Sequence, residues 1–345
     1  MSNPRRILYI RSETIKNEHR TPIVPKDIPL LLSYGYTVYI ESAHNRIYND
    51  SEYSYNGAIV TEKKWWDSLF QNAYILGLKE VADIDKLDSH THVYFSHSYK
   101  GQTHAKQLLE TFAKNQGTLY DLEYFLDDGN NRVVSFGFYA GVAGCYLGLL
   151  QYLHKSTSRK NIPSLHIETF QRDTINAIFD KKRSPLASLR IAIVGGGGNC
   201  GKGVISILQT LGAHYDVFGK TSDKSTLHTY DIVFNCIKLD PGSNEVWFSN
   251  TTEFRTPLLI VDISCDPSQS NNPISIYKEE TTWETPVLSY NEFVDIIAIS
   301  NLPSLLPKES SDYFSSHCVE LFADTGSATW EKNKSIYLKH VETFI

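Results

Sequence analysis

The chain has 345 residues, of which 41% are hydrophobic and 21% charged, and its formal net charge is -6. A chain of this length exceeds what one hydrophobic core usually serves, so two domains are expected. The negative charge argues against a nucleic-acid-binding surface, which needs clustered Lys and Arg. No stretch reaches the roughly 18 consecutive apolar residues of a membrane span, and the N-terminal apolar run is too short for a signal peptide.

The five cysteines are widely spaced and form no CxxC motif. An odd number at such spacing fits reduced thiols better than a disulfide framework or a zinc site. We therefore expect a cytoplasmic protein without a metal site. The cysteines are Cys145, Cys200, Cys236, Cys265 and Cys318.

The first third of the chain alternates short apolar runs with amphipathic stretches, a pattern typical of βαβ units and parallel sheets. A helix is expected after the first strand, because Pro25-Lys26-Asp27 gives a start signal and Gly35 a stop signal. The expected strands are Arg6–Ile10, Thr37–Ile40, Tyr74–Leu78, His92–Ser96, Thr118–Tyr120 and Arg132–Phe136.

Small and apolar residues from Gly137 to Leu153 predict a long helix that packs closely against a neighbour and carries the chain from one domain to the other. The polar stretch from His154 to Ser188 then leads to a second group of strands. These are expected at Leu189–Val194, Tyr215–Phe218, Ile232–Cys236, Leu258–Ile263 and Ile296–Ile299.

A glycine-rich turn at residues 195–201 is the clearest motif, with Gly195, Gly198 and Gly201 in GxxGxxG spacing. A strand precedes the turn, and a helix is expected over Val204–Leu211. Glycine lets the backbone approach a pyrophosphate, and the start of a helix presents unpaired N–H groups. The order of strand, turn, helix and strand predicts a nicotinamide-dinucleotide site.

The tip of the strand after this helix indicates which dinucleotide to expect. NAD enzymes usually place an acidic residue there to hold the ribose, but the sequence reads Gly219-Lys220-Thr221-Ser222. A lysine with two hydroxyls suits a 2′-phosphate, so NADP(H) is expected slightly ahead of NAD(H). Asp223 lies just beyond and keeps NAD(H) open as the alternative.

Polar residues follow several expected strands of the first domain, where ligands of open α/β sheets bind. Lys79 and Glu80 follow one strand, His97 follows the next, and Asp121 and Glu123 follow a third. A lysine and a histidine at one edge suit proton exchange with an amine, an imine and a carbinolamine, with nearby carboxylates tuning them.

Two arginines are candidates for binding substrate carboxylates, because a guanidinium group matches a carboxylate in bidentate geometry. Arg20 follows the first strand and Arg132 follows a turn at Asp127–Asn130. In the second half of the chain, Ser264-Cys265-Asp266 follow the strand Leu258–Ile263 and add polar groups at its end.

Long segments of unusual composition carry a family resemblance: GLKE (77–80), FSHSYKGQ (95–102), GTLYDLEYF (117–125), VVSFGFYAG (133–141), DISCDPSQSNNPISIY (262–277) and LPSLLPKESS (302–311). They resemble saccharopine dehydrogenases of the lysine-forming type, within the wider group that has an alanine-dehydrogenase-like N-terminal domain. The matches run in order from about residue 7 to residue 314, so they cover nearly the whole chain.

The resemblance implies an α/β protein with two Rossmann-like domains, whose mainly parallel sheets flank a central cleft. Residues 1–136 with 304–345 would form the substrate and catalytic domain, and residues 137–303 the dinucleotide-binding domain. The activity implied is oxidation of saccharopine with NAD to an imine, then hydrolysis to lysine and 2-oxoglutarate, in either direction.

The resemblance also implies roles for single residues. The catalytic set would be Lys79, His97, Glu80 and Glu123. The substrate-binding set would be Arg20, Gln102, Arg132, Phe136, Ser264, Cys265 and Asp266. The cofactor-binding set would be Gly195, Gly197, Gly198, Asn199, Cys200, Gly201, Lys220, Thr221, Ser222, Lys238, Ile263, Ser300, Asn301 and Leu302.

Some positions depart from the family pattern. The acidic residue for the adenosine ribose is replaced around Lys220-Thr221, and an arginine just before Arg132 is Asn131. An Ile-Asp-His-Leu-Pro segment near the nicotinamide is here residues 299–303, Ile-Ser-Asn-Leu-Pro. These changes leave open both the cofactor and the substrate, while the acid–base and carboxylate-binding positions are retained.

We therefore predict an NAD(P)-dependent oxidoreductase that acts on a secondary-amine C–N bond through an imine, with saccharopine or a related opine-type amino acid as substrate. Its partners would be an amino acid and a 2-oxo acid. Two alternatives stay open: reductive amination with ammonia, as in alanine dehydrogenase, and a dinucleotide-binding regulator without catalysis. The sequence does not give the oligomeric state.

Overall fold

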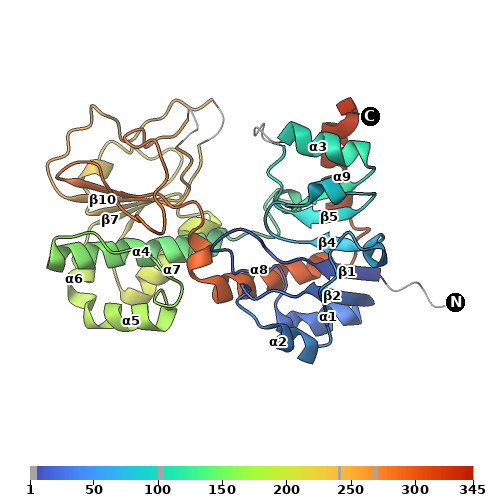
Figure 1. Cartoon of the computed structure of the whole chain (residues 1–345). Coiled ribbons are helices and arrows are strands. Elements are labelled where there is room, and N and C mark those ends of the chain that lie inside the picture. The colour runs from blue at the N-terminus through green and yellow to red at the C-terminus, as the bar shows by residue number, and fades with distance from the viewer. Residues whose placement is uncertain (1–5, 100–104, 240–241, 268–270, 345) are drawn as a thin grey trace. The chain divides into compact units, whose positions relative to one another are not determined.

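The computed structural model describes residues 6–99, 105–239, 242–267 and 271–344. The chain forms two compact units (Figure 1). The N-terminal unit consists of Met1–Ser135 together with Pro307–Ile345, and the central unit is Phe136–Leu306. Each unit is an α/β fold built around its own sheet.

The N-terminal unit contains a six-stranded sheet in the order β3-β2-β1-β4-β5-β6. All neighbouring strands run parallel, so each is joined to the next by a crossover. The strands β1, β4, β5 and β6 are mostly buried, as expected for a parallel sheet. The strands are β1 (Arg6–Ile10), β2 (Tyr36–Glu41), β3 (Ile59–Thr61), β4 (Tyr74–Leu76), β5 (Thr91–Tyr94) and β6 (Thr118–Asp121).

The C-terminal part of the chain completes the N-terminal unit (Figure 1, red). Asn333 of α9 accepts the N–H of Asp121 at 3.2 Å and donates to its carbonyl oxygen at 2.8 Å, which fixes α9 to β6. Trp330 of α9 is buried. The helices of this unit are η1 (Pro25–Asp27), α1 (Ile28–Ser33), α2 (Asp50–Tyr55), η2 (Ser68–Phe70), η3 (Ile84–Lys86), α3 (Ala105–Lys114), η4 (Leu122–Tyr124), α8 (Pro307–Leu321), α9 (Ala328–Val341) and η7 (Glu342–Phe344).

The central unit contains a second six-stranded sheet in the order β11-β12-β10-β9-β7-β8. Five strands are parallel, and only the short edge strand β11 pairs antiparallel, with β12. The strands are β7 (Ile191–Val194), β8 (Asp216–Phe218), β9 (Ile232–Asn235), β10 (Leu258–Asp262), β11 (Leu288–Ser289) and β12 (Val294–Ile297).

A close contact between two helices positions the glycine turn of the central unit. A Cβ atom on Gly141 of α4 would lie only 1.9 Å from the carbonyl oxygen of Cys200 in α7, so only glycine fits there. This agrees with the close packing predicted from the small residues of α4. The helices of this unit are α4 (Gly137–Ser158), α5 (Arg172–Lys181), α6 (Arg183–Ala187), α7 (Asn199–Leu211), η5 (Leu227–Thr229) and η6 (Leu302–Leu305).

The predicted α/β class with two mainly parallel sheets is confirmed, but individual elements differ. The strand predicted at Arg132–Phe136 is wrong: this segment contributes only an isolated antiparallel bridge between Leu126 and Arg132 before α4 begins. The sequence prediction also missed β3 and β11, which have three and two residues and lie at sheet edges. Short edge strands bury little apolar surface and leave a weak periodic signal.

Over the described ranges, no helix is long and apolar enough to span a membrane. Within the same ranges, no three or more His, Cys, Asp or Glu side chains are placed to hold a metal ion.

Candidate active site

Four strands of the N-terminal sheet bring the predicted catalytic residues to one edge. Because β1, β4, β5 and β6 are parallel neighbours, their carboxyl ends face the same side. Lys79 and Glu80 follow β4, His97 follows β5, and Glu123 lies in η4 directly after β6. The strand pairing therefore gathers the lysine, the histidine and the carboxylates that were predicted from separate segments.

Asp121 holds the backbone of His97 in an unusual conformation. His97 has φ of 52°, in the left-handed region that side chains other than glycine rarely adopt. A carboxylate oxygen of buried Asp121 accepts the N–H of His97 at 3.1 Å and the hydroxyl of Ser96 at 2.7 Å. The His97 ring also stacks on Phe95, with centroids 6.2 Å apart. These contacts turn the His97 side chain, which is 48% exposed, out of the sheet.

Glu123 connects His97 with Arg132. One carboxylate oxygen, Oε1, lies 3.5 Å from Nδ1 of His97 and 3.2 Å from Nη2 of Arg132. The Glu123 side chain is only 8% exposed, whereas those of His97 and Arg132 are about half exposed. The other carboxylate oxygen of Asp121 accepts the Glu123 N–H at 2.9 Å. A buried carboxylate thus orients two side chains that remain accessible to a ligand.

The backbone of Lys79 is held by residues that follow β1. Glu13 accepts the N–H of Leu78 at 2.7 Å and that of Lys79 at 3.0 Å. The Arg11 guanidinium donates to the carbonyl oxygen of Lys79 and lies 3.4 Å from Glu13. Burial raises the pKa of Glu13, with Arg11 opposing the effect. The predicted catalytic lysine therefore sits on a backbone fixed from both sides.

Glu18 and Arg20 form a buried bidentate ion pair next to Lys79. Arg20 donates from Nε to Oε1 of Glu18 at 2.8 Å and from Nη2 to Oε2 at 2.6 Å. Burial raises the pKa of Glu18, but Arg20 more than offsets this, and Lys79 lowers it further, so the net shift is downward. Arg20, which was predicted to bind a substrate carboxylate, therefore has an internal carboxylate partner in Glu18.

The surroundings of Lys79 favour its neutral amine. Burial lowers the pKa of Lys79 and the positive charge of Arg20 lowers it further, while Glu18, Glu13 and Glu80 act in the opposite direction. A lysine with a lowered pKa can accept a proton at a pH where an ordinary lysine is charged. The acid–base role of Lys79 stays a prediction, and the direction of this shift is favourable to it.

Three other predicted residues lie in different settings. Glu80 is exposed beside Lys79, and Gln102 lies outside the described residues. Phe136 belongs to the central unit, where it precedes α4 and its carbonyl oxygen accepts the N–H of Ala140 at 2.9 Å.

The glycine turn of the central unit lies between β7 and α7, as predicted. Gly195 has φ of +90°, and a Cβ atom there would lie 2.1 Å from Ile237. Gly198 is the N-cap of α7 and offers no side chain to its first N–H groups. Gly197, Gly198 and Asn199 are exposed. The turn thus presents open backbone and a helix N-terminus, as a pyrophosphate site requires.

Cys200 and Gly201 form the first turn of α7, beneath the glycine turn. Cys200 lies against Cys236 at the end of β9, and this contact, followed by burial, raises the pKa of the Cys236 thiol. All five cysteines are free thiols.

Residues after β9 and β10 form a second group at the same edge of this sheet. Lys238 forms an ion pair with Asp266, which joins a predicted cofactor residue to a predicted substrate residue. Ser264 and Cys265 are partly buried, and burial raises the pKa of the Cys265 thiol. Ile263 is buried in the core under α4.

The remaining predicted cofactor residues follow β12. Ser300 is exposed and Asn301 is the N-cap of η6. The carbonyl oxygen of Asn301 accepts the N–H of Ser304 at 3.1 Å. Leu302 is buried in the core of the central unit.

The loop after β8 is held by its own residues. The Ser222 hydroxyl accepts the N–H of Gly219 at 2.9 Å. Buried Lys224 donates to the carbonyl oxygens of Lys220 and Ser222 at 3.4 and 3.1 Å, and pairs with Glu245 at 2.8 Å. The Ser222 hydroxyl and the Lys224 ammonium group therefore hold the backbone of this loop.

Comparison with known proteins identifies the family. Residues 9–143 match the alanine dehydrogenase/PNT N-terminal domain. The saccharopine dehydrogenase [NAD(+), L-lysine-forming] of Candida glabrata is 32% identical over 96% of this chain and 96% of its own. The enzyme of the same name from Yarrowia lipolytica is 30% identical over 97% of each chain. The chain belongs to the saccharopine dehydrogenase family. An L-alanine dehydrogenase structure shares the fold, with a TM-score of 0.69, 13% identity and coverage of 96% of this chain and 94% of its own.

Membership of the saccharopine dehydrogenase family confirms the predicted family and the predicted oxidoreductase class. It corrects the cofactor, because the relatives are named NAD(+) enzymes and the predicted preference for NADP(H) was wrong. The structure supplies a physical reason. The prediction rested on Lys220, Thr221 and Ser222, but Ser222 and the nearby Lys224 are used within the loop. The residue types at positions 220–222 are therefore not enough to predict a phosphate-binding site.

Several residues that lie near the carboxyl ends of strands in the two sheets were not predicted from the sequence of this saccharopine dehydrogenase family member. Arg11 and Glu13 directly follow β1, so the strand-end rule that found Lys79 applies to them as well. Glu18 precedes Arg20 by two residues, and this spacing matches no general sequence motif for an ion pair. Asp262, the last residue of β10, accepts the side-chain amide of Asn235 at 2.9 Å and the hydroxyl of Tyr277 at 2.6 Å.

Proposed function

We propose that this chain is an NAD-dependent dehydrogenase that interconverts saccharopine with lysine and 2-oxoglutarate. The observation that carries the proposal is the placement of Lys79, His97 and Glu123 at one sheet edge, in a chain that is 32% identical to an enzyme of that name. The N-terminal unit would bind the substrate, and the central unit would bind the dinucleotide.

The glycine turn supports dinucleotide binding by the central unit. The positive φ of Gly195 and the uncapped N-terminus of α7 leave backbone N–H groups available for a pyrophosphate. NAD, when bound, accepts a hydride from the substrate carbon that carries the secondary amine, and NADH returns it in the reverse direction. Gly197, Gly198 and Asn199 would contact the pyrophosphate.

Lys79 would be the base that removes the proton from the secondary amine of saccharopine. Burial and the charge of Arg20 lower its pKa, which favours the neutral amine that a proton acceptor needs. In the reverse direction, the protonated Lys79 returns a proton to the nitrogen. Glu13 and Arg11 would hold its backbone in place.

His97 would carry the protons of imine hydrolysis. Water adds to the imine carbon, and the carbinolamine then breaks its C–N bond, which requires a proton on the leaving amine and loss of one from the hydroxyl. The 3.5 Å contact between Nδ1 and Glu123 orients the ring. Nε2 is then the nitrogen that faces the substrate.

Arg132 and Arg20 would bind substrate carboxylates. Arg132 is about half exposed, and its Nη2 lies 3.2 Å from Glu123. Arg20 is held by Glu18 through Nε and Nη2, so its effect on the substrate would come from its fixed positive charge. The free thiols fit a reducing compartment, and we propose a cytoplasmic enzyme.

The proposal is tested by following NADH absorbance with purified protein, 2-oxoglutarate and, in separate reactions, lysine, ornithine, other amino acids and ammonia. NADH oxidation that requires both lysine and 2-oxoglutarate, and releases saccharopine, is the expected result. Oxidation with 2-oxoglutarate and ammonia, without any amino acid, would instead support reductive amination of the alanine-dehydrogenase type. No oxidation with any pair would contradict a catalytic function.

A further inference from the structure

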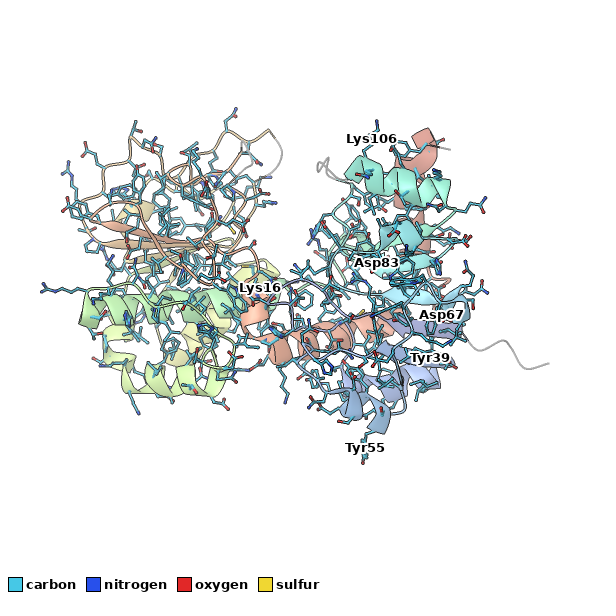
Figure 2. All side chains as sticks on the ribbon, in the orientation of Figure 1. Lys16, Tyr39, Tyr55, Asp67, Asp83 and Lys106 are labelled. Carbon is cyan, nitrogen blue, oxygen red and sulfur yellow. The ribbon has the colours of Figure 1, made fainter. Side chains whose placement is uncertain are left out.

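Three buried polar side chains form a hydrogen-bonded group at the carboxyl end of the sheet in the central unit. Asp262 is the last residue of β10, Asn235 is the last residue of the neighbouring strand β9, and Tyr277 follows β10 in the chain. One carboxylate oxygen of Asp262 accepts the side-chain amide of Asn235 at 2.9 Å, and the other accepts the Tyr277 hydroxyl at 2.6 Å. Apolar side chains pack on both faces of this sheet (Figure 2), and each of the three residues is at most 2% exposed. A buried carboxylate that is bonded through both oxygens is held in one orientation.

The charge states of this group make its hydrogen bonds strong. Burial raises the pKa of Asp262 to about 6, and the hydrogen bonds from Tyr277 and Asn235 act against this effect. The carboxylate is therefore ionised at pH 8. Burial and the charge of Asp262 raise the pKa of the Tyr277 hydroxyl, so this hydroxyl keeps its proton and donates it. Hydrogen bonds to an ionised acceptor are roughly twice as strong as those between neutral groups.

Asn235 connects Asp262 with the glycine turn. The side-chain oxygen of Asn235 accepts the N–H of Ile237 at 3.1 Å, so the amide group that donates to Asp262 also fixes the loop after β9. The Ile237 side chain packs against the first residue of the turn, because a Cβ atom on Gly195 would lie only 2.1 Å from Cγ2 of Ile237. The position of the turn therefore depends on Ile237 and, through Asn235, on Asp262.

Asp262 also holds the loop that follows its own strand. The backbone N–H of Ser264 donates to the Asp262 carboxylate. Two residues further on, Asp266 forms an ion pair with Lys238, which directly follows Ile237 in the loop after β9. The two loops are thus joined twice, by the buried carboxylate of Asp262 and by this more exposed ion pair.

We propose that Asp262 is a positioning residue for the dinucleotide site, an inference that rests on the proposed function. Asp262 is 1% exposed, so it acts through the groups bonded to it and does not touch the dinucleotide. It fixes the loops after β9 and β10 relative to each other and thereby holds Ile237 against Gly195. The glycine turn then presents its backbone N–H groups in fixed positions, and binding of the pyrophosphate does not have to order them first.

The test measures the dissociation constant of NADH by its fluorescence at pH 8, with the folded state of each variant checked by thermal unfolding. Asp262→Ala removes the bonds to Asn235, Tyr277 and Ser264, and the dissociation constant should rise about 10-fold because both loops lose their shared anchor. Asp262→Asn keeps the shape of the side chain, accepts from Asn235 and donates to the Tyr277 oxygen. This conservative variant should bind NADH within about 3-fold of the wild type, because the two side-chain contacts are kept.

Asp295→Ala is the matched control, because Asp295 is also a buried carboxylate in the same sheet. It is 4% exposed and accepts the side-chain amide of Gln151 at 3.2 Å and the hydroxyl of Ser289 at 2.8 Å. It lies beside Leu259, near the end of β10 opposite to Asp262. Loss of Asp295 should lower the unfolding midpoint and leave the dissociation constant of NADH unchanged.

If Asp262→Ala does not fold, Tyr277→Phe serves in its place. It removes a single hydroxyl and should raise the dissociation constant of NADH about 3-fold. Wild-type NADH affinity in folded Asp262→Ala, or in Tyr277→Phe, would overturn the positioning role. Equal losses of affinity in Asp262→Ala and Asp295→Ala would also overturn it, because the effect would then follow from lost stability. Failure of the proposed function is a different result, in which the wild-type protein binds NADH but does not oxidise it with lysine and 2-oxoglutarate.

Discussion

The carboxylate of Asp121 accepts the backbone N–H of His97 at 3.1 Å. Its second oxygen accepts the N–H of Glu123 at 2.9 Å, so one buried side chain at the end of β6 positions both partners of the His97–Glu123 contact. This makes Asp121 a positioning residue, although it is itself fully buried.

Asp121→Asn should lower kcat about 10-fold or more, because an amide replaces one of two accepting oxygens and the left-handed conformation of His97 loses support. The KM for NADH should stay within a factor of two, roughly, since the change is confined to the N-terminal unit. Steady-state kinetics measure both. Asp127→Asn is the control, because Asp127 also accepts a backbone N–H, that of Asn131 at 2.8 Å, but in an exposed turn. Equal kcat values for the two variants would remove the positioning role.

Lys79→Met should reduce turnover by about 10²–10⁴-fold, the usual contribution of a general acid–base group. Binding of NADH, followed by its fluorescence, should remain close to that of the wild type. The control is Lys86→Met, because Lys86 lies on the surface of the same unit, where it pairs with Asp85 at 2.7 Å. Normal turnover by the Lys79 variant would show that another group moves the proton.

The sequence predicted Lys79, His97 and Glu123 because each follows an apolar run whose strand is unmistakable, and parallel pairing then brings the strand ends together. It did not predict the conformation of His97, because a positive φ depends on the contact with Asp121, which lies 24 residues later.

The loop after β8 shows a second reason why a prediction from the sequence can be wrong. The residue type of Lys220 suggested a phosphate site. The structure shows that Lys224 binds the backbone of this loop, and this contact cannot be read from the sequence. The place of a residue at the end of a regular strand could be predicted from the sequence, whereas hydrogen-bond partners within irregular loops could not.

Glu18→Gln should destabilise the protein strongly. The change removes the Glu18 charge from its ion pair with the buried guanidinium of Arg20, and breaking one side of a buried ion pair costs about 3–5 kcal/mol. Urea-induced unfolding should therefore begin at clearly lower concentration. Glu253→Gln is the control, because Glu253 pairs with Arg255 at 2.7 Å with both side chains largely exposed, and exposed pairs contribute little. A Glu18 variant as stable as the Glu253 variant would contradict this account.

The Glu18–Arg20 ion pair also makes the stability of the protein depend on pH. The pKa of Glu18 is lowered in the folded protein, so its carboxylate stabilises the fold at pH values above the ordinary pKa of glutamate. That contribution is lost as the pH falls through the lowered value. The stability difference between the wild type and Glu18→Gln should therefore shrink in acid.

Asp262 should make the stability of the central unit depend on pH in the opposite direction. Burial raises its pKa from 3.8 to about 6, although Tyr277 and Asn235 donate hydrogen bonds to it. The protonated form is thus favoured in the folded state, and stability is lost as the pH rises through about 6. Each pKa unit corresponds to about 1.4 kcal/mol, so the loss between pH 4 and pH 7 should be roughly 3 kcal/mol.

Asp262→Asn isolates this effect because the amide cannot ionise. The thermal unfolding midpoint of the wild type, relative to that of the variant, should fall as the pH is raised from 4 to 7. Asp216→Asn is the matched control, since Asp216 also accepts a tyrosine hydroxyl, that of Tyr230 at 2.8 Å, but is exposed. The difference in unfolding midpoint between the wild type and Asp216→Asn should not fall over the same pH range. A constant difference for Asp262→Asn across this range would mean that Asp262 ionises in the folded protein as easily as in the unfolded chain.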